Sequence, residues 1–199
     1  MSIANTLADV CLREWEFFRR SSINLDGTST VGLREYDPGG WQRVADYWKF
    51  IGGAYANLTG LDRGTPWSAA FISWAMNAAG AGDKFPYSAG HATYINRAIK
   101  NAGISSAALI GHRLGEYAPK VGDLVGYWRG GKPISFDNAP KIGWYESHTD
   151  IVVEVGNGFV HCIGGNVLHS VTKRAVRTNA SGIVTDRKQN WFVVIENRI

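Results

Sequence analysis

Ser68, His148 and Asn166 are residue types that together form nucleophilic catalytic sites. A serine oxygen attacks a carbonyl carbon when a neighbouring imidazole takes its proton, and a third polar side chain holds the imidazole in place. Each residue alone has a plainer explanation, as a first-turn serine, an edge histidine and a turn asparagine. Only their order and spacing support the catalytic hypothesis, so the elements that position them decide it.

Ser68 lies at the predicted start of a buried helix. Thr65 is a suitable N-cap and Pro66 suits the first helical position, where its missing N–H costs nothing. The residues that follow, up to Gly80, are apolar on nearly every side. We therefore expect Ser68 to be the third residue of the first turn, where unpaired backbone N–H groups and the helix dipole stabilise negative charge.

His148 begins a predicted strand over 147–155, and residues 156–158 form a strong hairpin signal. With a three-residue turn, counting back along both strands sets His148 opposite Asn166. With a two-residue turn, it sets His148 opposite Val167. In either case Asn166 is adjacent to His148, with Cβ atoms about 5 Å apart when the two are directly paired.

After a two-residue turn, a one-residue bulge at Gly164-Gly165 would restore the first pairing. The same count places His161 near Val153 or Glu154, roughly 17–20 Å from His148 at the rise of a strand. His161 is therefore excluded as the residue that orients His148, and Asn166 is retained.

Four motifs in series resemble the NlpC/P60 and CHAP superfamily of papain-like cell-wall hydrolases, and the closest similarity is to the DUF2272 group. The four motifs are Thr65–Phe71, Pro119–Val125, Ser147–Val153 and Ile163–Val167. Phe85–His91 and the Tyr47-Trp48 segment also resemble that group. The resemblance covers residues 41–171 and implies a papain-like fold.

This resemblance implies an amidase or endopeptidase that cleaves amide bonds in the stem peptides of peptidoglycan. Ser68 matches the nucleophilic cysteine of these enzymes, His148 the general base and Asn166 the third polar residue. A serine hydroxyl needs a stronger base than a thiol does. Three explanations stay open: a native serine nucleophile, an engineered change of cysteine to serine, or an inactive descendant. The alternative function is accordingly a catalytically inactive peptidoglycan-binding or interaction module on the same fold.

Four more residues are candidates for substrate binding: Trp67, Tyr87, His91 and Asp150. His91 and Tyr87 line a groove in this interpretation, and core or cap positions explain them equally well. Asp150 shares a strand face with His148 and would raise the pKa of that imidazole. A third possible function is a glycosidase that uses Glu35 and Asp37 as its carboxylates. It has no geometric support, because both residues fall in or beside a predicted loop.

The composition describes a folded chain without an obvious polymer-binding arm. Of 199 residues 45% are hydrophobic and 19% are charged, and the net charge of +4 is spread along the sequence. No basic run predicts nucleic-acid binding. The only cysteines, Cys11 and Cys162, lack the spacing of a disulfide framework or a zinc site, so we expect no metal or cofactor.

The first twenty residues contain acidic and basic side chains and do not resemble a signal peptide. No apolar run is long enough to span a membrane. We expect synthesis in the cytoplasm and action at the periplasm or cell wall. Delivery by a phage lysis system or a contact-dependent secretion system, as for an antibacterial effector, would connect the two. Such an effector would have an immunity protein as a partner.

The hydrophobic periodicity changes halfway along the chain. Helical patterns begin near residue 3, after Asp37-Pro38, at 66 and after Ser88, while residues 21–36 and 129–146 are predicted loops. Strands are predicted at 121–128, 147–155, 159–163, 166–172 and 191–196. Helices followed by antiparallel strands predict an α+β domain over residues 1–199, with 1–40 as a helical N-terminal extension.

Overall fold

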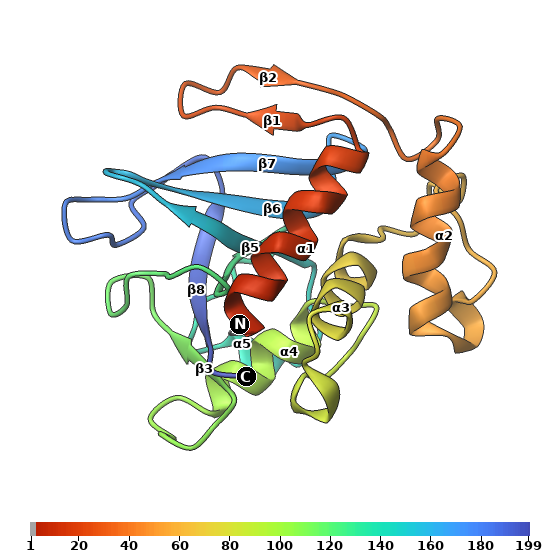
Figure 1. Ribbon diagram of the computed structural model, residues 1–199. Coiled ribbons are helices and arrows are strands. Elements are labelled where there is room, and N and C mark those ends of the chain that lie inside the picture. Colours follow the sequence, from red (N-terminus) through yellow and green to blue (C-terminus); the bar gives the residue numbers. More distant parts are fainter. Residues whose placement is uncertain (1–2) are drawn as a thin grey trace.

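An eight-stranded, mainly antiparallel sheet forms the centre of the protein in the computed structural model, which describes residues 3–199 (Figure 1). The strand order is β2-β1-β7-β6-β5-β4-β8-β3. In chain order the strands are β1 (Ser21–Ile23), β2 (Ser29–Thr30), β3 (Leu109–His112), β4 (Leu124–Trp128), β5 (Ser147–Val155), β6 (Phe159–Val167), β7 (Ser170–Arg177) and β8 (Asn190–Asn197).

Five α-helices accompany the sheet, and α1, α3 and α4 lie along one side of it (Figure 1). They are α1 (Ile3–Phe17), α2 (Gly40–Ile51), α3 (Ser68–Ala78), α4 (Ala92–Lys100) and α5 (Ala139–Ile142), with short 3-10 turns at Gly53–Tyr55 and Gly82–Lys84. The α+β class predicted from the change of periodicity is confirmed.

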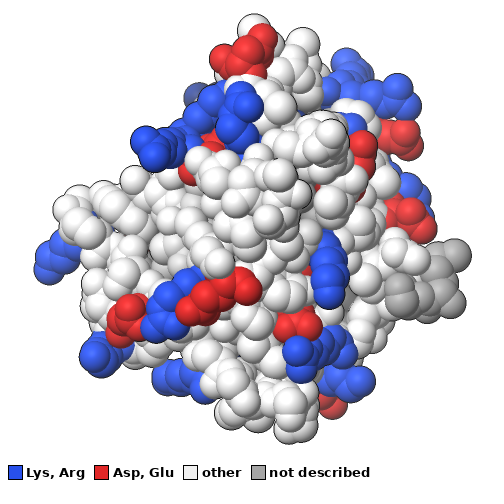
Figure 2. All heavy atoms as spheres, turned by 90° about the vertical axis from the view of Figure 1, so that its left-hand side faces the viewer, with Lys and Arg blue, Asp and Glu red and all other residues white. Residues whose placement is uncertain are grey.

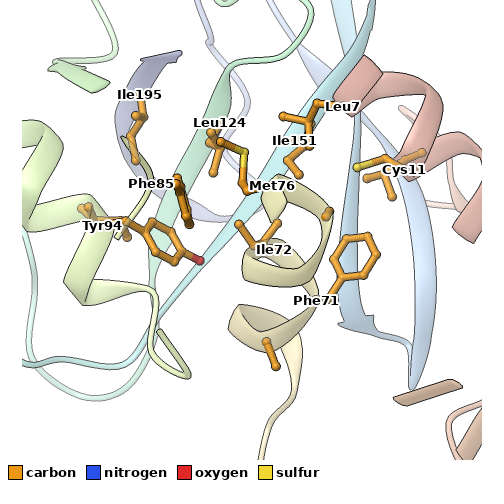
Figure 3. Close-up of a cluster of buried hydrophobic side chains, with 14 of the residues drawn as sticks. Leu7, Cys11, Phe71, Ile72, Met76, Phe85, Tyr94, Leu124, Ile151 and Ile195 are labelled. Atoms are coloured by element: carbon orange, nitrogen blue, oxygen red, sulfur yellow. The ribbon is translucent and has the colours of Figure 1, made fainter. Parts of the chain in front are cut away.

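Apolar side chains are buried on both faces of the sheet, which divides them into two clusters. The larger cluster joins the helices to Ile151 and Val153 of β5, and Figure 3 shows Phe71, Ile72 and Met76 of α3 within it. The smaller cluster lies on the other face and consists of Val125, Tyr127, Val152, Val160, Cys162, Val176, Val184 and Trp191. Because side chains alternate along a strand, odd-numbered residues of β5 up to Val153 face α3 and even-numbered residues up to Val152 face away from it, before a bulge between Val152 and Glu154 changes this order.

The first forty residues are more closely integrated than an appended extension would be. Leu7 and Cys11 of α1 are fully buried in the larger cluster, as the helical pattern predicts. The predicted loop at 21–36 instead contains the hairpin of β1 and β2, and β1 pairs in parallel with β7. This prediction failed because the pairing partner of β1 is about 150 residues away, beyond the reach of any local pattern.

Helices α2, α3 and α4 begin later than their N-terminal signals predict, and the N-cap of α4 is His91 rather than Ser88. The N-cap of α2 is Gly39 rather than Asp37, whose carboxylate accepts from the Arg34 N–H at 2.8 Å. Trp67, not Thr65, is the N-cap of α3, so Ser68 is its first helical residue and not its third. A side chain that can cap a helix can equally hold a turn, which is why these boundaries moved.

The second half corrects the predictions in two places. Residues 166–172 are not one strand, since a tight turn at Leu168-His169 separates β6 from β7 and both residues have positive φ angles. Strand β3 was not predicted, and it forms the sheet edge beside β8. The long loop at 129–146 is present and contains the short helix α5.

The hairpin of β5 and β6 has the predicted register, but its turn and its bulge combine differently from the prediction. The Gly156 N–H donates to the Phe159 carbonyl at 2.9 Å, which leaves a two-residue turn with Gly158 at φ +83°. The bulge that compensates lies between Val152 and Glu154, not at Gly164-Gly165. Ile151 then pairs with Ile163, and this register extrapolates to His148 opposite Asn166.

His161 pairs with Glu154, as predicted, and its Nδ1 atom lies 2.7 Å from the Glu154 carboxylate. The His161 side chain therefore contacts a residue far along β5 from His148 and does not orient that imidazole.

On the face drawn in Figure 2, acidic and basic side chains are interspersed. Within residues 3–199, no helix has the length and apolar character needed to cross a membrane. The same residues contain no group of three or more His, Cys, Asp or Glu side chains arranged to hold a metal ion.

Candidate active site

Ser68 lies at the N-terminus of α3, with only 4% of its surface exposed. The first backbone N–H groups of a helix have no partner within it, so the serine oxygen lies among free donors at the positive end of the helix dipole. Trp67, directly before it, packs against Phe18 and Tyr47 and donates its indole N–H to the buried Glu35 carboxylate. These contacts fix where the helix begins.

The side chain that contacts Ser68 is His91, from the start of α4. Ser68 Oγ and His91 Nε2 are 2.7 Å apart, and both residues are buried. On the other side of the ring, Nδ1 contacts the Tyr94 hydroxyl, lies 3.1 Å from Thr149 Oγ1, and accepts the Thr149 backbone N–H at 3.2 Å.

The position of this Thr149 N–H follows from the sheet. The Val152 N–H donates to the Asp123 carbonyl on the β4 side of β5, so the Thr149 N–H, three residues earlier, points to the opposite edge. There the paired ladder with β6 ends at Ile151 and Ile163. His91 thus takes the donor that β6 leaves unpaired.

This contact determines the tautomer of His91. A backbone N–H can only donate, so Nδ1 accepts and the proton of the neutral ring is on Nε2. In this arrangement Nε2–H donates to Ser68 Oγ. For His91 to accept the serine proton, its own proton must move to Nδ1, where the Tyr94 and Thr149 hydroxyls are both able to accept it.

His148 lies in a second, closed network on the other face of β5. Its Nε2–H donates to Asp150 Oδ1 at 2.8 Å, and the other carboxylate oxygen lies 3.0 Å from Nε of Arg174. The side chains of His148 and Asp150 are both 0% exposed. The free ring nitrogen, Nδ1, accepts a 3.4 Å contact from the Arg129 guanidinium.

The two imidazoles are neighbours although they belong to different networks. Their ring centroids are 5.0 Å apart. The His148–Asp150 pair requires a glycine at position 164 of β6, because a Cβ there would lie 1.7 Å from Asp150 Oδ1 and 2.9 Å from His148 Nε2. Gly164 therefore has a packing role here, and the register shift next to it, between Gly164 and Val167, belongs to the pairing of β6 with β7 and not with β5.

Burial keeps both histidines neutral near pH 7. It lowers the pKa of His91 well below the usual 6.5, and electrostatic interaction with the neighbouring His148 and Arg129 lowers that pKa further. For His148, burial outweighs the opposing effect of Asp150, so its pKa is also lowered. Burial would raise the pKa of Asp150, but Arg174 and His148 outweigh it and hold that pKa below its usual 3.8.

A cavity of about 330 Å³ opens beside Ser68 and His91. Its other walls come from the loop before α4 and from the segment that joins β4 to β5, and they include Pro66, Gly90, Arg129, Trp144 and Glu146. Trp144 is 73% exposed, the highest value among the large apolar side chains of residues 3–199. The Ser68–His91 pair is therefore accessible to a small substrate group, whereas His148 does not line this cavity.

The third residue of the predicted triad lies elsewhere. With its amide oriented to satisfy both neighbours, Asn166 donates to Glu35 Oε2 at 3.0 Å and accepts from the Trp67 N–H at 3.3 Å. It therefore supports the start of α3, and no hydrogen bond between it and His148 is found within residues 3–199.

The predicted substrate-binding residues divide in the same way. His91 lines the cavity. Trp67 and Asp150 are buried away from it, and Tyr87 donates its hydroxyl to the Gly82 carbonyl and packs on Phe50. These three residues therefore do not line the cavity beside Ser68.

Sequence reasoning also missed residues of the site: Tyr94, Arg129, Thr149 and Arg174. Thr149 was detectable in principle, because strand alternation puts it on the opposite face from His148 and Asp150. Arg129 and Arg174 come from separate elements, and no local pattern connects them to the site.

Comparison with known proteins gives one match. The family model of DUF2272, described as an uncharacterized protein conserved in bacteria, matches residues 35–197. The chain belongs to this family. No curated protein and no solved structure matches the chain. The matched DUF2272 region includes Ser68, both histidines and the whole cavity wall, and it begins at Glu35, the carboxylate that holds Trp67.

Proposed function

We propose that this DUF2272 protein is a hydrolase that cleaves amide bonds with Ser68 as the nucleophile and His91 as its general base. The observation that carries the proposal is the 2.7 Å contact between Ser68 Oγ and His91 Nε2, at a helix N-terminus that opens into a cavity. A nucleophile and base within hydrogen-bond distance, with the base held by further groups, are the geometric requirement for acyl transfer.

The reaction begins after the Thr149 N–H has ceased to donate to Nδ1 and His91 has taken the tautomer with its proton there, donated to the Tyr94 or Thr149 hydroxyl. Ser68 Oγ attacks the carbonyl carbon while its proton passes to Nε2, and the backbone N–H groups at the start of α3 stabilise the oxyanion. His91 then gives this proton to the leaving amine. Water, deprotonated by the same nitrogen, hydrolyses the acyl-serine ester and restores the serine.

His148 has a supporting role in this proposal, in place of the base role expected from the resemblance. It is fully buried, does not line the cavity, and uses Nε2 to hold Asp150. Asn166 supports the helix start through Trp67.

The substrate class comes from the resemblance of the motifs to papain-like NlpC/P60 and CHAP hydrolases. We infer amide bonds of peptidoglycan stem peptides, hence action at the cell wall or periplasm, and an immunity protein as partner if the chain is a delivered effector. The exposed Trp144 at the rim supports a substrate larger than one amino acid, since aromatic rims pack against extended ligands.

One observation favours a second candidate, a peptidoglycan-binding module without activity. In the tautomer set by the Thr149 N–H, His91 donates to Ser68 Oγ and has no free lone pair to accept its proton. A site fixed in that state would bind an amide and leave it uncleaved.

Release of soluble muropeptides from purified sacculi distinguishes the two functions. We expect the unaltered chain to release them and Ser68→Ala to lose at least about a thousandfold in rate. Ser73→Ala is the matched control, because Ser73 is a buried serine of the same helix that bonds only Ser88. It should cost stability and leave release intact. Binding of sacculi without release by the unaltered chain would favour the module.

A further inference from the structure

The cavity beside Ser68 continues into a second hollow of about 280 Å³. The two share Arg129, Trp144, Tyr145 and Glu146, and the second also contains Lys132. A substrate that reaches Ser68 therefore lies along this shared wall, and its charged residues decide what the groove accepts.

Arg129 is the residue of this shared wall that contacts His148. Its Nη2 atom donates to the Tyr127 hydroxyl at 2.9 Å and to His148 Nδ1 at 3.4 Å, and its backbone N–H donates to the Glu146 carbonyl at 2.8 Å. The main chain and one terminal nitrogen are thus fixed beside His148, and the residue also lines both hollows.

The remaining donors of this guanidinium have no anionic partner. Arg129 is exposed, and within residues 3–199 it forms no ion pair with a carboxylate. The Glu146 carboxylate does not pair with it and lies instead against Gly130, where an added Cβ would be 3.1 Å from Oε2. A guanidinium has five N–H donors in a planar fork that matches the two oxygens of a carboxylate.

We propose that Arg129 is a specificity residue that binds a carboxylate of the substrate beside the Ser68–His91 pair. The inference rests on the proposed function for its choice of a peptide substrate. An oriented cation with free donors at the wall of the cavity selects peptides that carry a free carboxylate near the scissile amide over their amidated forms. Charge-assisted, two-pronged contacts of this kind give both affinity and orientation.

Calorimetric titration in the Ser68→Ala background tests the binding without turnover. The probes are a synthetic stem tetrapeptide with free carboxylates and the same peptide with its carboxylates amidated. We expect the free form to bind roughly 10- to 100-fold more tightly, and Arg129→Gln to remove this preference. Arg129→Lys keeps the charge without the fork and should retain part of it.

Arg187→Gln is the matched control, because Arg187 is an exposed arginine on the segment between β7 and β8, outside both hollows. It should leave the preference unchanged. Equal binding of the two peptides, no binding of the free form at millimolar concentration, or a preference that survives Arg129→Gln would overturn the inference.

The two proposals fail in different ways. If the unaltered chain binds the free peptide through Arg129 and never cleaves it or sacculi, the hydrolase function is wrong and the carboxylate site stands. If cleavage depends on Ser68 but is indifferent to the carboxylate and to Arg129, the function stands and this inference is wrong.

Discussion

The two faces of β5 hold two histidine networks built from different partners. On the face toward the helices, His91 is held by uncharged groups, the Tyr94 and Thr149 hydroxyls and one backbone N–H, and it contacts Ser68 beside an open cavity. On the other face, His148 is enclosed with Asp150 and Arg174. Hydroxyl partners can donate or accept, so they allow His91 to change its tautomer once the Thr149 N–H no longer donates to Nδ1, whereas a carboxylate paired with arginine fixes the tautomer of His148.

We infer from this difference that the two networks have different roles. The His91 network is arranged for proton transfer, and the His148 network for stability. Removing one partner from a buried charged network is costly because the others are left uncompensated. Losing an open, uncharged network disturbs the fold less and the chemistry more.

The largest expected effect is the contrast between His91→Gln and His148→Gln. We expect His91→Gln to lower muropeptide release roughly a hundred- to a thousandfold at a modest loss of stability. His148→Gln should instead lower the free energy of unfolding by about 3 kcal/mol and change the rate of the folded protein by less than about tenfold. Denaturant unfolding and release rates, measured on both variants, check this. The reverse pattern would restore His148 as the base.

Gly164→Ala tests how the enclosed network is accommodated. The new Cβ would lie 1.7 Å from Asp150 Oδ1, so we expect a loss of about 2–3 kcal/mol in the free energy of unfolding. Gly131→Ala is the control, since nothing lies within 4 Å of its added Cβ. Equal stability of the two variants in urea would contradict the packing described here.

A change of pH is expected to have a smaller effect on the stability of the folded protein. The pKa values of His91 and His148 lie below their usual 6.5 in the folded protein, so the unfolded chain binds more protons just below that pH. Their contribution to stability is complete above pH 6.5 and decreases on acidification, by up to roughly 1 kcal/mol for each histidine at pH 5.5. Asp150, whose pKa is lowered from 3.8, loses its contribution only below that value.

Urea unfolding at pH 7.5 and 5.5 measures this decrease, and His148→Gln should reduce it. The groups that set the charge around His91 are His148, Arg129 and the hydroxyl of Tyr94. A stability that is flat over this range, or that rises on acidification, would show that these histidines are not held neutral.

The sequence contained the register of the site and not the direction in which its side chains point. The hairpin count brought His148 opposite Asn166, and alternation correctly joined His148 to Asp150. Strand β5 is buried on both faces, however, so its pattern does not reveal which face meets the helix of Ser68. For this reason the prediction placed His148 on the face of β5 that meets Ser68, and His148 lies on the opposite face.

Asn166 shows a second limit of local reasoning. It has a positive φ angle of 56° just before the turn into β7, and its amide reaches Glu35 and Trp67 rather than its neighbour across the ladder. The prediction assumed regular strand geometry at that position. The contact of Ser68 with His91 depends on how α4 packs against β5, which is a tertiary relation between separate segments.

The central claim is that Ser68 is a nucleophile activated by His91, and covalent labelling tests it most directly. A fluorophosphonate reacts with activated serine hydroxyls, and intact-mass and peptide mass spectrometry locate the adduct. We predict one adduct, on Ser68, that is lost in Ser68→Ala and His91→Gln and kept in Ser73→Ala. The account would be contradicted if a protein that releases muropeptides from sacculi gave no adduct on Ser68. It would also be contradicted if Ser68 were labelled equally in the unaltered chain and in His91→Gln.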